Sequence, residues 1–175
     1  MSEPLMLFKK PSYPINPSLL DYLERFDRIS KVPISYDDLL RFSGSINVYD
    51  KNEHDTLWIR VYYNEFERNE IDLTLKKIYS LLHSDGNLGI IKFLNVDSID
   101  YCTFGNSKPF RIKVRNILND NYTHFYIKKA DASRVYGLEL EHILSPDKIN
   151  FLVYQDTLIE EHIMGIAGDV FIKDY

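Results

Sequence analysis

The sequence has little of what disulfide-bonded, metal-binding and membrane-spanning proteins require. It holds one cysteine, Cys102, in 175 residues, which excludes a disulfide or a cysteine-based metal site within one chain. Its 5 histidines lie far apart, without the spacing of common metal sites. No apolar run approaches the length that spans a bilayer, and the apolar start is too short for a signal peptide. We therefore expect no membrane partner and a reducing, cytoplasmic compartment, with Cys102 as a buried thiol.

Positive charge is also sparse, and it is not clustered. The chain has 21 Lys and Arg residues against 26 Asp and Glu residues, a formal net charge of −5. Proteins that bind duplex nucleic acid usually carry a basic patch or run, so we expect no nucleic-acid partner. The most basic segment, residues 110–115, alternates cations with apolar residues, which is typical of a strand with one solvated face.

The first half of the chain predicts an extended arm followed by a mainly helical part. Four of the 7 prolines lie in residues 1–17, where they disfavour helix and inner strand. Ser18 with Asp21, and Ser35 with Asp38, have the spacing of helix-capping pairs. Residues 56–63 predict a strand, 70–83 a helix and 89–96 a short buried strand. We divide the chain into an arm (1–17), a helical or mixed part (18–94) and a sheet subdomain (95–175).

The second half predicts a sheet. Residues 98–104, 110–118 and 122–129 alternate between apolar and polar positions and are separated by turn residues, which indicates a three-stranded antiparallel meander. Residues 132–144 predict a helix, 149–154 and 157–163 two more strands, and Gly165 to Gly168 a glycine-bearing exit. The predicted fold class is therefore α+β, with a five-stranded antiparallel sheet and one packed helix after the helical part.

Short motifs stand at consistent places in this predicted sheet. Tyr126-Ile127-Lys128 is similar to the Ala-Ile-Lys strand of kinases, and Glu139 follows eleven positions later in the predicted helix, with Glu141 as its competitor. Residues 158–165 look like the strand and hinge that hold adenine, and Ser107-Lys108-Pro109 looks like a Ser/Lys/Pro phosphate loop. Over about residues 95–175, the chain thus resembles the N-terminal lobe of an atypical, phosphoinositide-kinase-related kinase.

That resemblance implies a nucleotide site with ATP as its ligand. Ser107, Lys108 and Lys128 would contact the phosphates, Glu139 would form an ion pair with Lys128, and the main chain of Glu161 and Ile163 would contact the adenine. Glu160 stands where the family usually has a neutral residue. The family's catalytic and metal-binding loops belong to a second lobe that this sequence does not contain, so we expect an incomplete kinase that needs that lobe in cis or in trans.

Other interpretations of the same residues remain open. Lys128 is also consistent with an ordinary strand lysine, and Glu139 and Glu141 with the solvated face of a helix. The acidic charge, the proline-rich arm and the missing catalytic set fit a non-catalytic interaction protein equally well. Such a protein would be an inhibitor, an immunity-type protein or a subunit of an assembly, with a protein partner. An enzyme of another kind is a third possibility.

Overall fold

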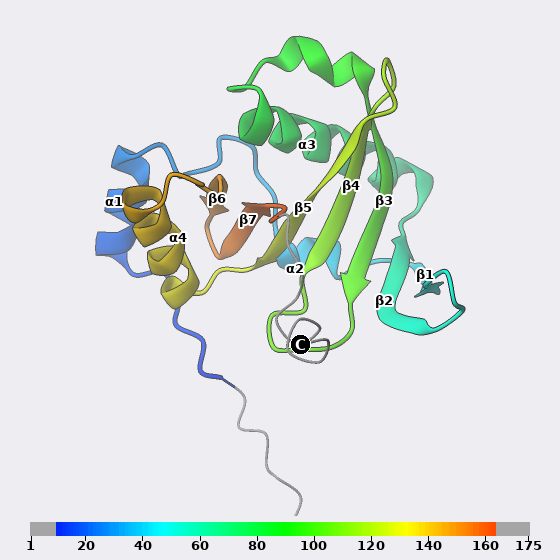
Figure 1. Cartoon of the computed structure of the whole chain (residues 1–175), viewed down its shortest axis with the longest axis horizontal. Coiled ribbons are helices and arrows are strands. Elements are labelled where there is room, and N and C mark those ends of the chain that lie inside the picture. Colours follow the sequence, from blue (N-terminus) through cyan, green and yellow to red (C-terminus); the bar gives the residue numbers. More distant parts are fainter. Residues whose placement is uncertain (1–9, 164–175) are drawn as a thin grey trace, which may run out of the picture.

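A single antiparallel sheet organises the computed structural model, which describes residues 10–163. In this range the sheet has seven strands in the order β1-β2-β3-β4-β5-β7-β6 (Figure 1). The strands are β1 (Gly44–Tyr49), β2 (Asp55–Tyr62), β3 (Leu94–Cys102), β4 (Phe110–Asn116), β5 (Tyr122–Lys129), β6 (Phe151–Tyr154) and β7 (Thr157–Glu161). The helices are α1 (Pro17–Arg25), α2 (Tyr36–Leu39), α3 (Glu65–His83) and α4 (Ala132–Leu144), with a 3₁₀ helix, η1 (Leu88–Phe93).

The α+β class with an antiparallel sheet is confirmed, but the predicted strand count and the helical N-terminal part are wrong. Seven strands are present in the described residues instead of five, because β1 and β2 extend the sheet beyond β3. Most of β1 is exposed, so it lacks the alternation of apolar and polar residues that identifies a half-buried strand. As a result, the sheet runs continuously across the boundary that we predicted between residues 94 and 95.

Local capping explains where the helix predictions succeeded and where they failed. α4 has the predicted bounds, and Ser35 accepts a hydrogen bond from the amide of Asp38 at the start of α2 as expected. α3 begins five residues earlier than predicted, because Asn64 caps it. The strand predicted for residues 89–96 is wrong up to residue 93, because Asn87 accepts a hydrogen bond from the amide of Gly89 and starts η1, whereas residues 94–96 form the start of β3.

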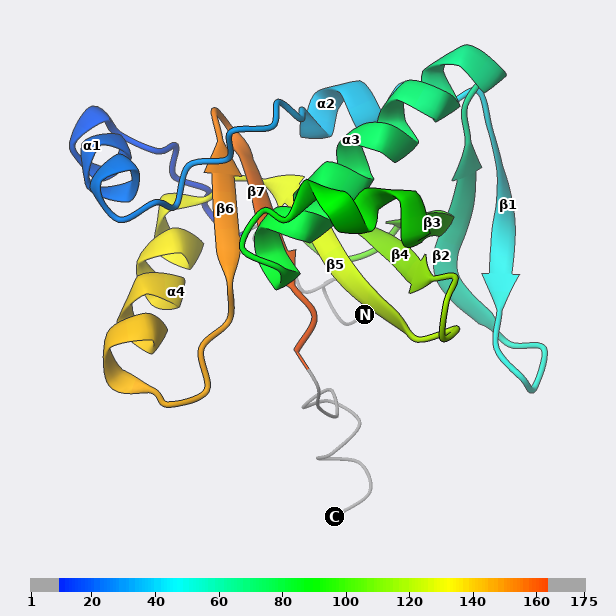
Figure 2. The same cartoon turned by 90° about the horizontal axis from the view of Figure 1, so that it is seen from above.

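Two apolar clusters cover different parts of the sheet. On one face, α2 and α3 lie over the central strands (Figure 2). The inward-facing side chains beneath them include Phe110, Ile112 and Phe125, which are fully buried. On the other face, α1 and α4 pack against β6 and β7 around Leu23, Val135 and Leu158. Because side chains alternate along a strand, the polar residues of β4 and β5 point to this second face.

Segments without regular structure close the β6 edge of the sheet. The amide of Val153 donates to the carbonyl of Arg28 (2.7 Å), and the amide of Ser30 donates to the carbonyl of Val153 (2.8 Å). Further towards the N-terminus, the amide of Tyr13 donates to the side-chain carboxylate of Asp131, and its carbonyl accepts from the amide of Ala132 at the start of α4. Residues 1–9 of the predicted arm lie outside the described range. Of the helices in residues 10–163, none is long and apolar enough to cross a membrane.

Candidate functional site

A cationic cleft lies where the β3–β4 loop, the end of β5 and the start of α4 meet. Its volume is about 860 Å³. Segment 10–12 and the loop 105–108 form parts of its wall. Its charged lining consists of five cations and one carboxylate: Lys10, Lys108, Lys128, Lys129, Arg134 and Asp131. Carboxylates behind the lining offset part of this positive charge, and the cations that they leave unpaired favour an anionic ligand.

The β3–β4 loop is a tight turn that is anchored at both ends. Gly105 and Lys108 have positive φ angles of 75° and 37°, which let the chain reverse within a few residues. The amide of Cys102 donates to the carbonyl of Pro109 (3.0 Å), which closes the base of the loop. The hydroxyl of Tyr36 donates to the carbonyl of Lys108 (2.8 Å), so α2 holds the loop at the rim of the cleft.

Glu160 is the carboxylate that orients the cations on the cleft floor. It is 4% exposed, and its Oε2 lies 3.0 Å from Lys128 Nζ. Arg134 donates to both carboxylate oxygens, from Nε at 2.8 Å and from Nη2 at 3.1 Å. Burial raises the pKa of Glu160, but the hydrogen bond from Arg134 and the charges of Lys128 and Arg134 outweigh it and leave the pKa below its ordinary value.

The other cations of the cleft differ in how far nearby carboxylates offset them. Lys129 lies between Asp37 and Asp156, with Nζ–Oδ2 distances of 2.5 and 2.6 Å. Lys10 and Lys108 have no carboxylate within ion-pair distance among residues 10–163. Asp131 is already engaged, because its Oδ1 accepts the amides of Tyr13 (3.0 Å) and Ser133 (3.3 Å). Lys108 is thus the loop cation most available to an anion.

Three of the six site residues predicted from sequence line this one cleft: Ser107, Lys108 and Lys128. Ser107 and Lys108 are exposed on the loop, and Lys128 is half-buried on the floor. The loop and Lys128 are twenty residues apart in the chain, and the antiparallel pairing of β4 with β5 brings them together.

The predicted ion pair between Lys128 and Glu139 is wrong for the described structure. Glu139 accepts hydrogen bonds from Arg28 Nε (2.6 Å) and from the hydroxyl of Tyr22 (3.1 Å). Both partners come from α1 or the residues just after it, which pack on α4. Lys128 pairs instead with Glu160, which lies opposite Tyr126 in the β5–β7 register and is therefore a diagonal neighbour of Lys128.

The two residues predicted to contact adenine lie away from the cleft lining. The carboxylate of Glu161 accepts hydrogen bonds from the backbone amide (2.8 Å) and the side-chain amide (3.1 Å) of Asn150. It also lies 3.2 Å from His83 Nδ1 of α3. Ile163 is 52% exposed. The segment with Gly165 and Gly168, which was predicted as the exit, lies outside the described residues.

Sequence reasoning missed Arg134 and gave Glu160 no positive role. Arg134 lies near the start of α4, where helical periodicity alone marks it as solvated. The register of β5 against β7 reveals both roles, because it places Tyr126 opposite Glu160 and Lys128 opposite Leu158. That register joins two strands that are separated in the chain by α4 and β6, and no local pattern specifies it.

The described residues offer neither a metal site nor a reactive thiol near this cleft. Within residues 10–163, no three His, Cys, Asp or Glu side chains are grouped to hold a metal ion. Cys102 is buried as expected, and its Sγ donates to the carbonyl of Phe104 (3.3 Å). Burial raises the pKa of this thiol, which keeps it protonated and poorly nucleophilic at neutral pH.

Comparison with known proteins adds no family to these observations. No protein-family model, no curated protein and no solved structure matches this chain. The cleft, with its loop, its cations and its buried carboxylate, is therefore the basis for assigning a function.

Proposed function

We propose that this chain is a kinase-like half-fold that binds the phosphates of a nucleotide such as ATP in the cationic cleft, together with a second lobe supplied in cis or in trans. The observation behind the proposal is the meeting of Ser107, Lys108 and Lys128 in one cleft. The resemblance to a kinase lobe implied that these three residues contact phosphate.

The chemistry of the cleft suits phosphate oxygens. Lysine ammonium groups bind phosphates as point charges, and the hydroxyl and amides of a tight loop add directional donors. Glu160 takes over the positioning role that was expected of Glu139, since it holds the Lys128 ammonium on the cleft floor. The order β3-β4-β5-α4-β6-β7 is also the order of elements in the family that the sequence resembles.

The cleft is open, so the chain by itself should bind weakly. Charges in contact with solvent interact through a high effective dielectric, and each contact contributes modestly. A second lobe would cover the ligand and supply the metal-binding and catalytic groups that are missing from this sequence. We therefore expect nucleotide binding by this chain at millimolar concentration and no phosphoryl transfer.

Thermal denaturation with added ligand tests this proposal. ATP and inorganic tripolyphosphate should both raise the melting temperature, while adenosine should not, because phosphates supply the attraction. With Lys108→Gln, about ten times more ligand should be needed for the same rise in melting temperature. A factor of about ten is the usual effect of losing one charged hydrogen bond. Lys77→Gln removes the same charge from α3 on the opposite face of the sheet and serves as the matched control.

The variants also define the results that oppose the proposal. Lys108 has no ion-pair partner among the described residues, so Lys108→Gln should leave the ligand-free melting temperature unchanged. If ATP stabilises the Lys77 and Lys108 variants equally, the phosphates bind elsewhere. If adenosine stabilises as well as ATP, the cleft is not a phosphate site.

A non-catalytic interaction protein is the second candidate, and the outer face of α4 favours it. Four large apolar side chains with exposures of 50–77% follow one another at helical spacing: Tyr136, Leu140, Ile143 and Leu144. A row of this kind is characteristic of a surface that another protein covers. The nucleotide experiment separates the candidates, because a chain used only for protein binding shows no saturable response to ATP.

A further inference from the structure

The part of the sheet opposite α3 carries a second cationic surface, distinct from the cleft. We call it the open face and define it by Trp58, Arg60, Asp100, Arg111, Lys113 and Tyr126. α2 and α3 cover the other side of these strands, and α1 and α4 cluster only with the β6–β7 end of the sheet. Among residues 10–163, therefore, no helix packs through an apolar cluster onto the open face.

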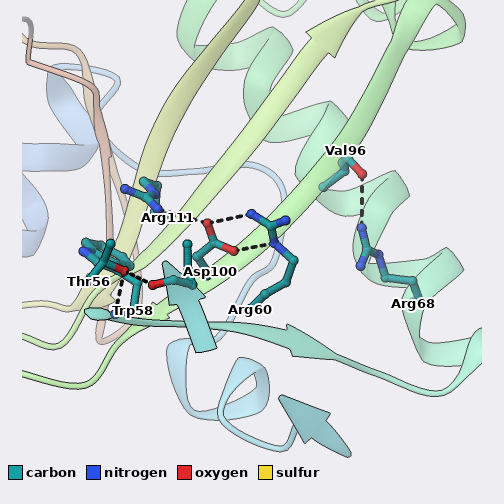
Figure 3. Close-up of polar contacts among 8 residues, drawn as sticks. Thr56, Trp58, Arg60, Arg68, Val96, Asp100 and Arg111 are labelled. Carbon is teal, nitrogen blue, oxygen red and sulfur yellow. Dashed lines mark hydrogen bonds and ion pairs between the residues drawn. The ribbon is translucent and has the colours of Figure 1, made fainter. Parts of the chain in front are cut away.

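Ion pairs fix the cations of this face without neutralising them. Arg60 Nε and Arg111 Nη2 both bind the carboxylate of Asp100, at 2.9 and 3.1 Å, and Asp100 is 2% exposed (Figure 3). One buried carboxylate thus holds two guanidinium groups in place. Lys113 has no carboxylate within ion-pair distance in the described range, and its ammonium lies 4.1 Å from the centre of the Tyr122 ring.

The balance of charge therefore favours an anionic partner. At the β7 border, Lys128 and Arg134 share Glu160 in the same way that Arg60 and Arg111 share Asp100. Those two cations belong to the cleft lining, but the open face itself carries three cations, Arg60, Arg111 and Lys113, against one carboxylate, Asp100, in a chain whose net charge is −5. At the far end, Arg115 pairs with Asp97 and Asp120, which offset its positive charge.

A histidine on this surface responds to the same field. His124 lies opposite Lys113 on β5, and its pKa is lowered to about 4 by burial and then by the charges of Arg111, His162 and Lys113. Burial is the larger cause of this shift, and the positive potential that adds to it also attracts negative charge to the surface around His124.

The width of the face and the state of its aromatic rings point to the kind of partner. From β2 to β5 the face spans three strand spacings, about 14 Å, which is too wide for one small anion. The ring of Trp58 already stacks on Arg111 (4.2 Å), and the ring of Tyr126 stacks on His162 (5.7 Å between centroids), so these rings are poor platforms for bases. Tryptophan, tyrosine and arginine side chains of this kind are enriched in the centres of protein interfaces.

We propose that the open face is a docking surface for a protein partner with an acidic surface. Fixed guanidinium groups at the centre select carboxylates by geometry, and Lys113 on the same strand as Arg111 adds an ammonium group to the attraction. The inference goes beyond the proposed nucleotide cleft and does not depend on it, since Lys113 is not part of the cleft lining.

The experiment uses the full chain and a fluorescent peptide of twenty glutamates as the probe, with binding followed by anisotropy. We expect saturable binding that weakens with salt, and a loss of about tenfold in affinity for Lys113→Glu. Lys77→Glu on α3 makes the same change of charge behind the sheet and should change affinity less than about twofold. Lys113→Gln, which avoids a new contact with Arg111, should give an intermediate loss.

Three results would overturn the inference. The first is the absence of saturable binding to the peptide. The second is an equal loss for the Lys113 and Lys77 variants, which would mean that only net charge matters. The third is tighter binding of a single-stranded oligothymidylate of the same length, which would make nucleic acid the partner. A failure of this docking proposal can be told apart from a failure of the nucleotide-site proposal, because Lys113→Glu should leave the stabilisation by ATP unchanged.

Discussion

At the scale of residues, two buried carboxylates, each shared by two cations, fix the positions of the charged side chains on the sheet. Glu160 binds Lys128 and Arg134, and Asp100 binds Arg60 and Arg111. Buried charges are tolerated only when such partners satisfy them, so each carboxylate fixes the geometry of the cations around it. Glu160 thereby links the stability of the β5–β7 region to the geometry of the proposed phosphate site.

The pH dependence of stability should reveal Glu160. Its pKa is depressed from an unfolded value of 4.5, so its contribution to stability is present above about pH 4.5 and is lost as the pH falls through the folded pKa. Glu160→Gln should lower the free energy of unfolding by about 2–4 kcal/mol at pH 7, because two cations lose their partner. Urea unfolding measured between pH 7 and pH 3 should show this difference shrinking below pH 4.5.

Glu141→Gln provides the control for that series. Glu141 lies on α4 without an ion pair among the described residues, and its variant should stay within about 0.5 kcal/mol of the wild type at every pH. A difference for Glu160→Gln that is constant from pH 7 to pH 3 would contradict the assigned role of its charge.

Residue types could be predicted from sequence here, but their partners could not. Ser107, Lys108 and Lys128 meet as expected, since their meeting depends on a β4–β5 hairpin whose alternation and turn are local signals. The partner of Glu139 was misjudged because Arg28 comes from 111 positions earlier in the chain. No local pattern of α4 shows that α1 will pack on it.

At the scale of elements, caps decide where the helices begin. Sequence spacing favoured Ser18 as the cap of α1, but the helix begins at Pro17 and Asn16 is the cap. The side chain of Asn16 accepts the amide of Leu19 at 2.9 Å. Proline is well tolerated at the first position of a helix, because the amide hydrogen that it lacks would be unpaired there in any case. Pro17 is therefore compatible with the start of α1.

The cap assignment leads to a paired prediction. Asn16→Ala should lower the free energy of unfolding by about 1 kcal/mol, the usual effect of removing a capping side chain. Ser18→Ala should change it by less than about 0.5 kcal/mol, because Ser18 lies inside the helix and does not cap it. Urea denaturation followed by circular dichroism measures both, and a larger effect for Ser18 would restore the sequence-based assignment.

At the scale of the whole molecule, the described chain should unfold as one cooperative unit. The core cluster under α3 includes Leu75 and Ile78 from the first half of the chain and Phe110 and Phe125 from the second. The pairing of β2 with β3 likewise joins the two halves. The fold class could be predicted because it follows from alternation along each strand, whereas the extension of the sheet by β1 depends on pairing between exposed residues.

Leu75→Ala tests this cooperativity. Leu75 is fully buried, so the variant should lose about 2–5 kcal/mol. Hydrogen exchange should show that the amides of β4 and β5 lose as much protection as those of α3. If only the amides of α3 lose protection, the helix and the central strands are separate units.

The most direct test of the central claim is an NMR titration of the ¹⁵N-labelled chain with ATP. The proposed function predicts saturable shifts of the amides of Ser107, Lys108 and Lys128 at millimolar ATP, with the same amides responding to tripolyphosphate. It also predicts that Lys108→Gln weakens the response about tenfold, while Lys77→Gln leaves it intact. Saturable shifts confined to other parts of the chain, or a response that is unchanged in Lys108→Gln, would contradict a phosphate site in the cleft.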